Sequence, residues 1–208
     1  MAGVGFGPSD FALFDIDDPD QRGTALGETL LPKLLSLGDN CVSGLSRVAG
    51  QDLHLHAARV QRRRQDAPEE LLVAFSDSPR GYRGMPFLGV ALTREHLHAR
   101  VGVRGESRRR EPMRRALQRE APNLAKKGKP FRRLRQFVGW NFEELPELAP
   151  AHSSAFWLEV ADGLAPGNPG LDLGIAWLSD EARSLALGDL LGVFRDLAPL
   201  YKVLANAK

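Results

Sequence analysis

The sequence predicts an α+β fold, in which a largely antiparallel sheet is packed by two long helices within a single domain of residues 1–208. Alternating apolar residues persist through three consecutive segments, 71–75, 87–92 and 97–103, which is the pattern of strands with a buried face. Two long stripes of apolar residues at steps of three and four, one in each half of the chain, predict the helices. A length of 208 residues suffices for one sizeable core.

The first long helix is predicted to begin after Asp18-Pro19, because aspartate caps helices and proline suits the first helical position. A short turn capped by Ser9-Asp10 precedes it. We expect the helix to end at Gly50 and to kink at Pro32, since proline removes a backbone donor and crowds the preceding turn. Its buried stripe is Leu26, Leu30, Leu34, Leu37, Cys41, Leu45 and Val48.

The predicted strands form a meander with one buried face. A short strand over 53–57 comes before the three central segments. The loop 77–84, between the first two of these, is rich in turn residues. In the last segment the buried phase is Leu97, Ala99, Val101 and Val103, which leaves His96, His98, Arg100 and Arg104 at the opposite phase.

A basic helix and loop follow the strands. Ser107 is expected to cap a helix that Pro122 stops at about Ala121, because proline has no backbone donor to continue it. A flexible lysine-rich loop comes next. Residues 137–142 are apolar again and form either a strand or a packed loop.

The last part of the chain adds two helices and one strand. Ser153 or Ser154 caps a helix that ends at Gly163, and alternating residues over 171–177 predict a strand. Ser179 opens the terminal helical region. Its stripe is Leu187, Leu190, Leu191, Phe194, Leu197, Tyr201 and Leu204.

The net charge of +2 conceals a segregation of charge along the chain, since residues 1–58 carry net −5 and residues 104–136 carry net +10. Such asymmetry bears on partners rather than on fold. The single cysteine, Cys41, excludes an internal disulfide and a multi-cysteine zinc site. Without a signal core or an apolar run of membrane-spanning length, we expect a cytoplasmic protein that does not enter a membrane. No cofactor is predicted.

One combination of short segments is specific enough to point to a family. These segments are Asp10-Phe11, Phe14, Ile16, Pro32-Lys33-Leu34, Leu37-Gly38, Leu45-Ser46, His56-Ala57-Ala58-Arg59, Arg62-Arg63, Val73-Ala74-Phe75, Arg80-Gly81-Tyr82-Arg83, Pro86, His96 and Pro199-Leu200-Tyr201-Lys202. Together they resemble the YktB-like bacterial proteins, a family of unassigned function. The resemblance implies an α+β domain of this size and no known activity. In that pattern a histidine is expected where Val60 stands and an aromatic where Leu72 stands. The segment 104–136 is more basic than the resemblance implies, so a function that depends on it is expected in a branch of the family.

Six residues of the front half favour the binding of phosphate or carboxylate. Guanidinium groups bind these anions bidentately, and a turn built on Gly81 brings backbone donors to the same anion. The candidates are Arg59, Arg62, Arg63, Arg80, Tyr82 and Arg83. The structural alternative is that Arg80 and Arg83 pair with acids such as Asp77 and fix the loop.

The basic segment 104–136 suits a polyanion better than a small ligand, because its charge is spread over a helix and a loop. Within it we select Arg109, Arg115, Lys127 and Arg132 as contacts to DNA or RNA. The nearby aromatic residues either stack on unpaired bases or belong to the core, and the core is favoured. They are Phe131, Phe137 and Trp140. The leading hypothesis is therefore a nucleic-acid-binding protein that does not read sequence.

The competing hypothesis is an enzyme or binder that takes a phosphorylated or carboxylate ligand in a pocket on the sheet. His56, Arg59, Arg80 and Tyr82 are its candidate ligands, and His96 is a further pocket candidate. The sequence identifies no catalytic residue. An adaptor for acidic partners fits the same charge distribution.

Two histidine pairs have the spacing of candidate metal ligands. His54 with His56, and His96 with His98, each share one face of a strand. They chelate zinc or iron together only if their strands are neighbours. We take surface or hydrogen-bonded histidines as the default, and predict no metal site.

Overall fold

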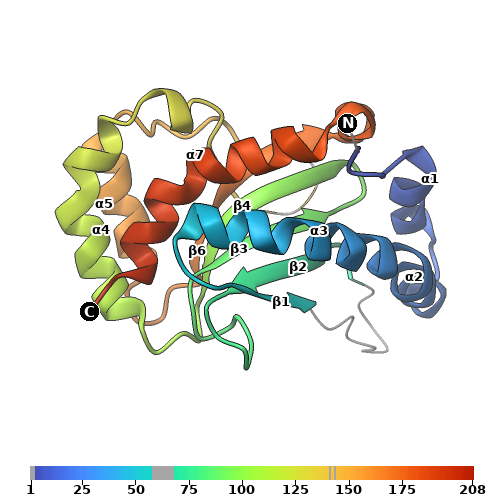
Figure 1. The fold of residues 1–208 in the computed structure, drawn as a ribbon, viewed down its shortest axis with the longest axis horizontal. Helices are drawn as coiled ribbons and strands as arrows, with labels where there is room; N and C mark the ends of the chain where they lie inside the picture. Colours follow the sequence, from blue (N-terminus) through green and yellow to red (C-terminus); the bar gives the residue numbers. More distant parts are fainter. Residues whose placement is uncertain (1–2, 58–67, 141, 143) are drawn as a thin grey trace.

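Six strands form one sheet in the computed structural model, which describes residues 3–57, 68–140, 142 and 144–208 (Figure 1). Every neighbouring pair is antiparallel, and the spatial order is β1-β2-β3-β4-β6-β5. The strands are β1 His54–Ala57, β2 Leu71–Ser76, β3 Phe87–Leu92, β4 His96–Arg104, β5 Arg135–Gln136 and β6 Gly170–Leu178. The predicted α+β fold with a largely antiparallel sheet is thereby confirmed.

Two long helices, α3 (Leu31–Ala49) and α7 (Leu187–Ala205), lie across one face of the sheet, as expected (Figure 1). Their stripes and alternate residues of the central strands form the main core, in which Leu34 and Phe194 are fully buried. The other helical segments are α1 Pro8–Phe11, η1 Ala12–Asp15, α2 Pro19–Ala25, η2 Leu26–Leu30, α4 Arg110–Ala125, η3 Lys129–Phe131, α5 Ser154–Asp162 and α6 Ser179–Ser184. None of the described helices is both long and apolar enough to span a membrane.

The ends of the first long helical region follow the sequence. Asp18 caps α2, and its Oδ1 accepts a hydrogen bond of 2.8 Å from the backbone N–H of Gln21. Gly50 ends α3 with a φ of 78°, a left-handed conformation that glycine adopts without strain. Near Pro32 the structure shows a π-helical turn, η2, which ends directly before α3. Pro32 therefore falls in the first turn of α3, where its missing N–H costs least.

The prediction that Pro122 stops the fourth helix was wrong, because α4 continues to Ala125. Pro122 is exposed close to the end of the helix, so its missing N–H removes one hydrogen bond of the last turns. On the buried side, Leu117, Ala121 and Leu124 continue one stripe into the core. The burial of this stripe outweighs the local cost of the proline.

Two predictions for the later part of the chain hold. Oγ of Ser153 caps α5 by accepting a hydrogen bond of 3.2 Å from the N–H of Ala155, and Gly163 follows the end of the helix. Of the two alternatives for residues 137–142, the packed loop is correct for the described residues, which follow the two-residue strand β5.

The second face of the sheet is also buried, contrary to the expectation of one buried face. His96, His98 and Arg100 are each at most 2% exposed. Beside them a smaller apolar cluster consists of Leu72, Ala74, Tyr82, Phe87 and Ala91. Tyr82 belongs to the loop between β2 and β3, and Phe137 and Trp140, which pack on the histidines, follow β5. Loops distant in sequence therefore cover polar side chains that strand alternation assigns to solvent.

Candidate functional site

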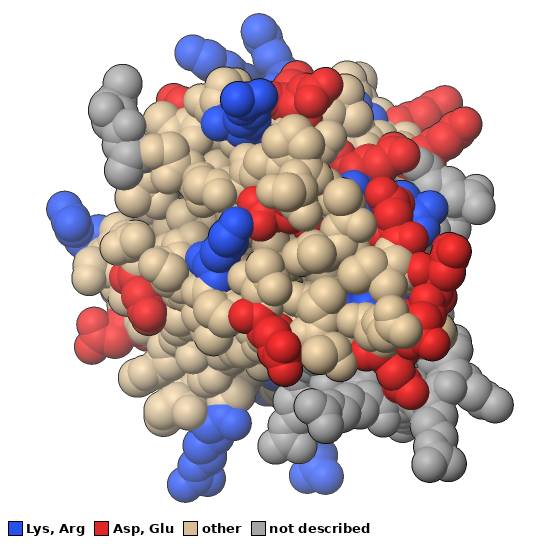
Figure 2. Space-filling model, turned by 90° about the vertical axis from the view of Figure 1, so that its right-hand side faces the viewer, with Lys and Arg blue, Asp and Glu red and all other residues tan. Residues whose placement is uncertain are grey.

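The basic segment 104–136 lies at the opposite end of the molecule from the acid-rich N-terminal helices (Figure 1). α4 stands at one end of the sheet, and α1 and α2 stand at the other. Figure 2 views the end that carries α1 and α2, where acidic side chains form a band along one side of the surface. The acidic start of the chain and the basic segment are therefore also separated in space, whereas α5 and α7, which belong to the acidic last part of the chain, pack against α4.

Several arginines of the basic segment bind the protein's own backbone. Arg109 donates to the carbonyl of Ala207 at 3.1 Å. Arg110 donates to the carbonyl of Asn168 at 2.9 Å. These guanidinium groups tie α4 to distant loops, so only part of their hydrogen-bonding capacity remains for a ligand.

Glu111 forms ion pairs with two more arginines of α4. Its carboxylate accepts hydrogen bonds from Nε of Arg114 at 2.8 Å and from Nε of Arg115 at 2.9 Å. These hydrogen bonds lower the pKa of Glu111 to about 2. Arg115 is thus paired within its own helix, and its contribution to the positive field is reduced.

The exposed cations concentrate at the turn after α4, which we call the lysine turn and define as residues 126–132. It carries Lys126, Lys127, Lys129 and Arg132, all exposed. Within the described parts of the chain, none of these four forms a salt bridge. Two of the selected contacts, Lys127 and Arg132, therefore lie in the least compensated part of the segment.

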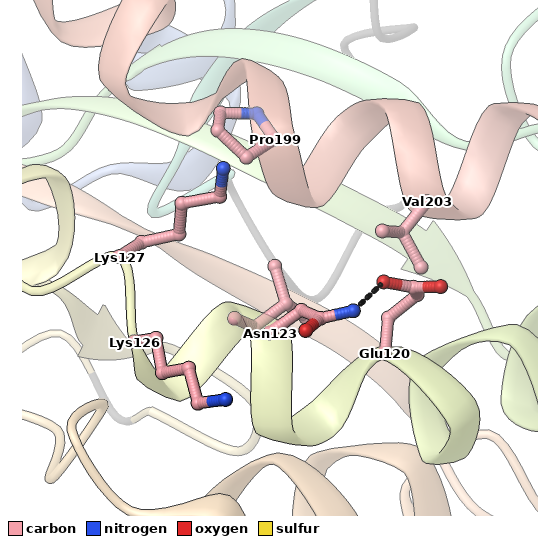
Figure 3. A pocket seen from close by; sticks show the side chains of 7 residues that line it. Glu120, Asn123, Lys126, Lys127, Pro199 and Val203 are labelled. Carbon is pink, nitrogen blue, oxygen red and sulfur yellow. Dashed lines mark hydrogen bonds between the residues drawn. The ribbon is translucent and has the colours of Figure 1, made fainter.

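A groove of about 480 Å³ opens beside the lysine turn, between the C-terminal half of α4 and α7 (Figure 3). Its lining is Glu120, Asn123, Leu124, Lys126, Lys127, Pro199 and Val203. Lys127 extends toward Pro199, while the amide of Asn123 donates to Glu120 at 2.8 Å. The groove thus combines a cationic rim with an apolar wall.

The arginine loop, residues 77–84, contacts the start of the basic segment. Arg83 forms an exposed ion pair of 3.3 Å with Glu106, and Ser107 donates to the carbonyl of Gly84 at 2.8 Å. Arg80 is exposed. Arg83 thus pairs with an acid, as the structural alternative for this loop expects, and that acid is Glu106. The candidates Arg59, Arg62 and Arg63 lie outside the residues that the structure describes.

Tyr82 does not point to solvent with these arginines. It is 7% exposed and packs edge-on against Phe87, with ring centroids 5.0 Å apart. Arg104 lies over the same two rings, with its guanidinium carbon 5.8 Å from the Tyr82 centroid. The loop therefore separates its tyrosine, which belongs to the sheet, from its exposed arginines.

The aromatic residues proposed as stacking platforms are packed inside the protein. Phe131 is 2% exposed and packs against Trp157 at 5.1 Å between ring centroids. Phe137 is 5% exposed and lies 5.0 Å from the ring of His98. Trp140 is half-buried, and its ring lies 4.9 Å from that of His98. The structure agrees with the interpretation that these aromatic residues pack within the protein.

The histidine pairs are far apart in the sheet, because β2 and β3 separate β1 from β4. His56 places Nε2 at 2.9 Å from the carbonyl of Ser78, close to Tyr82. His96 is 2% exposed and packs against Trp140. Among the described residues, no group of three or more potential ligands could hold a metal ion.

Sequence reasoning missed one polar cluster, which is centred on Arg100. Its guanidinium contacts Glu70 at 2.6 Å and Asp172 at 3.1 Å. The available signal was the phase of Arg100, which lies two residues from His98 on the same face of β4. The alternation of β4 assigns that phase to solvent, so it gives no sign of either acid.

Comparison with known proteins identifies the family. A family model described as a domain of unknown function (DUF1054) matches residues 6–145. A UPF0637 protein of Bacillus licheniformis is 34% identical over 97 residues, which are 47% of this chain and 46% of the relative. One of Staphylococcus haemolyticus is 33% identical over 103 residues, or 50% of this chain and 51% of the relative. One of Bacillus velezensis is 31% identical over 126 residues, or 61% and 60%.

The chain spans about half the length of the first two relatives. The family model, in contrast, covers well over half of the chain, from the first helix to beyond β5. This agrees with the YktB-like resemblance of the front half. The chain therefore belongs to the DUF1054 family of bacterial UPF0637 proteins, a family without an assigned function.

Proposed function

We propose that the protein binds a polyanion, and that this partner is a nucleic acid held by the lysine turn. The observation that carries the proposal is the set of four exposed cations within residues 126–132, which lack described acidic partners. The acid-rich helices α1 and α2 lie at the other end of the molecule (Figure 1). An external polyanion balances this charge and releases its own counterions on binding.

The proposed contacts are to phosphate rather than to bases. Lysine is a point charge that binds phosphate without fixed geometry, and three of the four cations are lysines. Phe131, the aromatic residue nearest to them in sequence, is buried against Trp157. Binding of this kind positions a strand without reading its sequence.

The groove beside the lysine turn supports the same interface. Lys126 and Lys127 line both the groove and the turn, so a backbone that crosses the turn also meets the groove (Figure 3). The arginine loop lies at the start of α4, which is 16 residues long. Since a helix rises about 1.5 Å per residue, Arg80 and the turn are too far apart to hold one phosphate.

The test is a salt titration of binding to mixed-sequence single-stranded and duplex DNA and RNA. The variant Lys127→Glu/Arg132→Glu is expected to weaken binding at least tenfold at low salt. It should also reduce the slope of log K against log salt concentration by roughly 1.5, because each lost phosphate contact removes about 0.7–0.9 from the slope.

The matched control is Arg47→Glu/Arg183→Glu, which changes the net charge equally at exposed positions outside the segment. It should leave most of the binding intact. Equal losses of binding in both variants would mean that net charge alone explains the weakening, and would contradict the lysine turn as the interface. Absence of any binding by the wild type at low salt would overturn the proposal itself.

A further inference from the structure

The groove beside the lysine turn has walls that are fixed by the packing of the protein itself. α7 packs against α4 and against η3, the helical turn within the lysine turn. On the α4 side Leu124 is 2% exposed, and on the α7 side Pro199 and Val203 are half-buried and one turn apart on the same face. The volume of about 480 Å³ lies within the range of about 300–1,000 Å³ that is typical of small-molecule sites. The groove therefore has room for more than a phosphate group.

The apolar wall of the groove is not explained by phosphate binding. Lys127 extends toward Pro199, so a cation stands beside this wall (Figure 3). A phosphate that bound Lys127 would gain nothing from the proline ring or from the methyl groups of Val203, because a charged group loses hydration against apolar surface. The wall therefore fits an uncharged part of the same partner, one that has apolar surface and a covalent link to a phosphate.

Another part of the groove presents oxygen atoms. The amide nitrogen of Asn123 donates to Oε2 of Glu120 at 2.8 Å, which directs Oδ1 of Asn123 away from that carboxylate. Oε1 of Glu120 lies 3.9 Å from Nε of Arg119, a distance too long for a hydrogen bond. Both side chains line the groove, so among the described residues each keeps one oxygen atom available as an acceptor. A partner with N–H donors along one edge matches these two acceptors.

An unpaired nucleobase combines the features that the groove requires. It has apolar faces, its Watson–Crick edge carries N–H donors, and its sugar links it to phosphates. In a duplex the faces are stacked on neighbouring base pairs and the edge is paired with the opposite strand, so neither can enter the groove. All four bases carry an N–H donor on that edge. The groove therefore distinguishes an unpaired base from a paired one without selecting a sequence.

We infer that the lysine turn binds single-stranded nucleic acid and that the groove holds one unpaired base of the strand. The face of the base packs on Pro199 and Val203, and its edge donates to the two acceptors. The adjoining phosphates bind Lys126 and Lys127. The inference rests on the proposed function, because the same strand supplies these phosphates. The contacts of the lysine turn remain contacts to phosphate, and the groove adds one to a base.

The test compares two strands that differ only in their bases. One is a single-stranded DNA of mixed sequence, and the other is an abasic strand with the same number of sugar and phosphate units. Fluorescence anisotropy of the end-labelled strands measures both affinities for the full chain at one salt concentration. We expect the strand with bases to bind at least fivefold more tightly, because a base that packs on the protein adds to the affinity of the phosphates. Equal affinities of the two strands would overturn the inference.

Two variants locate the base in the groove. Val203→Ala removes part of the apolar wall, and its control Val193→Ala alters another half-buried valine of α7 that does not line the groove. Asn123→Ala removes an acceptor, and its control Gln118→Ala alters another amide of α4 that does not line the groove. Each groove variant should weaken the strand with bases at least threefold and leave the abasic strand and a duplex unchanged. The controls should bind all three as the wild type does.

The outcomes separate this inference from the proposed function. Asn123 is exposed and alanine favours a helix, so Asn123→Ala serves if Val203→Ala does not fold. Groove variants that weaken both strands equally, or weaken neither, would overturn the inference. Binding that still depends on Lys127 and Arg132 would then leave the polyanion proposal standing. If the wild type binds no strand at low salt, the proposed function fails as well.

Discussion

Phe87 of β3 lies over Gly102 of β4, its directly paired neighbour. A Cβ built on Gly102 would stand 2.3 Å from Cζ of Phe87, far inside van der Waals contact. Phe87 is fully buried and also packs against Tyr82, so its ring has little freedom to move away. The absence of a side chain at 102 is therefore what allows the aromatic cluster to cover the sheet.

Gly102→Ala should destabilise the protein by roughly 2–4 kcal/mol, because the methyl group forces the ring or the strand to shift. Chemical denaturation measures the change. Gly84→Ala is the control, since a Cβ there would meet no atom within 4 Å. Adding Phe87→Leu to Gly102→Ala should recover part of the loss. Additive losses in the double variant would contradict the proposed clash.

The raised pKa of Asp172 predicts that its contribution to the stability of the protein is lost as pH rises. Burial raises its pKa to about 6 from 3.8, despite the opposing charge of Arg100. The folded state therefore holds this proton more tightly than the unfolded chain, and the stabilisation is complete below about pH 4 and lost as pH rises through 6. Two units of pKa correspond to at most about 3 kcal/mol.

Asp172→Asn should accordingly gain stability relative to the wild type between about pH 4 and pH 7. Urea titrations at several pH values give the difference at each point. Asp196→Asn is the matched control, because this aspartate is exposed on α7. A constant difference between Asp172→Asn and the wild type across this range would contradict the raised pKa.

The lowered pKa of His98 predicts the opposite dependence of stability on pH. Its pKa lies well below 6.5, chiefly because of burial and also because of the charge of Arg100. The unfolded chain then binds the proton more readily, so the contribution of His98 is present above pH 6.5 and is lost at lower pH. His98→Gln should lose less stability than the wild type on acidification from pH 7 to pH 5. A parallel loss in both proteins would show that the imidazole is charged in the fold.

Cys41 should be unreactive in the native protein. It is fully buried in α3, and burial raises the pKa of its thiol to about 12, so the reactive thiolate is nearly absent at neutral pH. We expect modification by an aromatic disulfide reagent to proceed at the rate of unfolding and to accelerate with urea. Rapid labelling in buffer, with no change in the far-UV spectrum, would contradict this.

Pro122→Ala should stabilise the protein by about 1 kcal/mol, since alanine supplies the missing N–H near the end of α4. The side chain is exposed, so its removal leaves no cavity. Thermal unfolding compares this variant with Gln118→Ala, one turn earlier in the same helix. A loss of stability in Pro122→Ala would mean that the proline ring makes contacts that outweigh the hydrogen bond.

The sheet and its main core could be predicted because their pattern is local. Alternation at Val73, Val90 and Val101 is visible within each strand, and the stripes of α3 and α7 are visible within each helix. Neither requires knowledge of what lies across the sheet. The helix caps at Asp18 and Ser153 could be predicted for the same reason, because each is recognised from the residues next to it in the sequence.

The polar cluster could not be predicted because its burial is not local. The alternation in β4 assigns Arg100 to solvent, whereas its covering groups come from other parts of the chain: Glu70 before β2, Trp140 after β5 and Asp172 in β6. For the same reason, the sequence does not show that Arg109 is bound by the carbonyl of Ala207. Every residue has a backbone carbonyl, so an acceptor of this kind cannot be recognised from the residue type.

Both outer strands of the sheet are short, since β1 has four residues and β5 has two. An exposed edge invites a strand from another molecule to add to it, and the length of unpaired backbone sets how well it can. The described residues of β1 and β5 offer room for few intermolecular hydrogen bonds, whereas β6 pairs with β5 only at Leu173 and Gly174. Self-association by addition of a strand to β1 or β5 should therefore be weak even at high protein concentration.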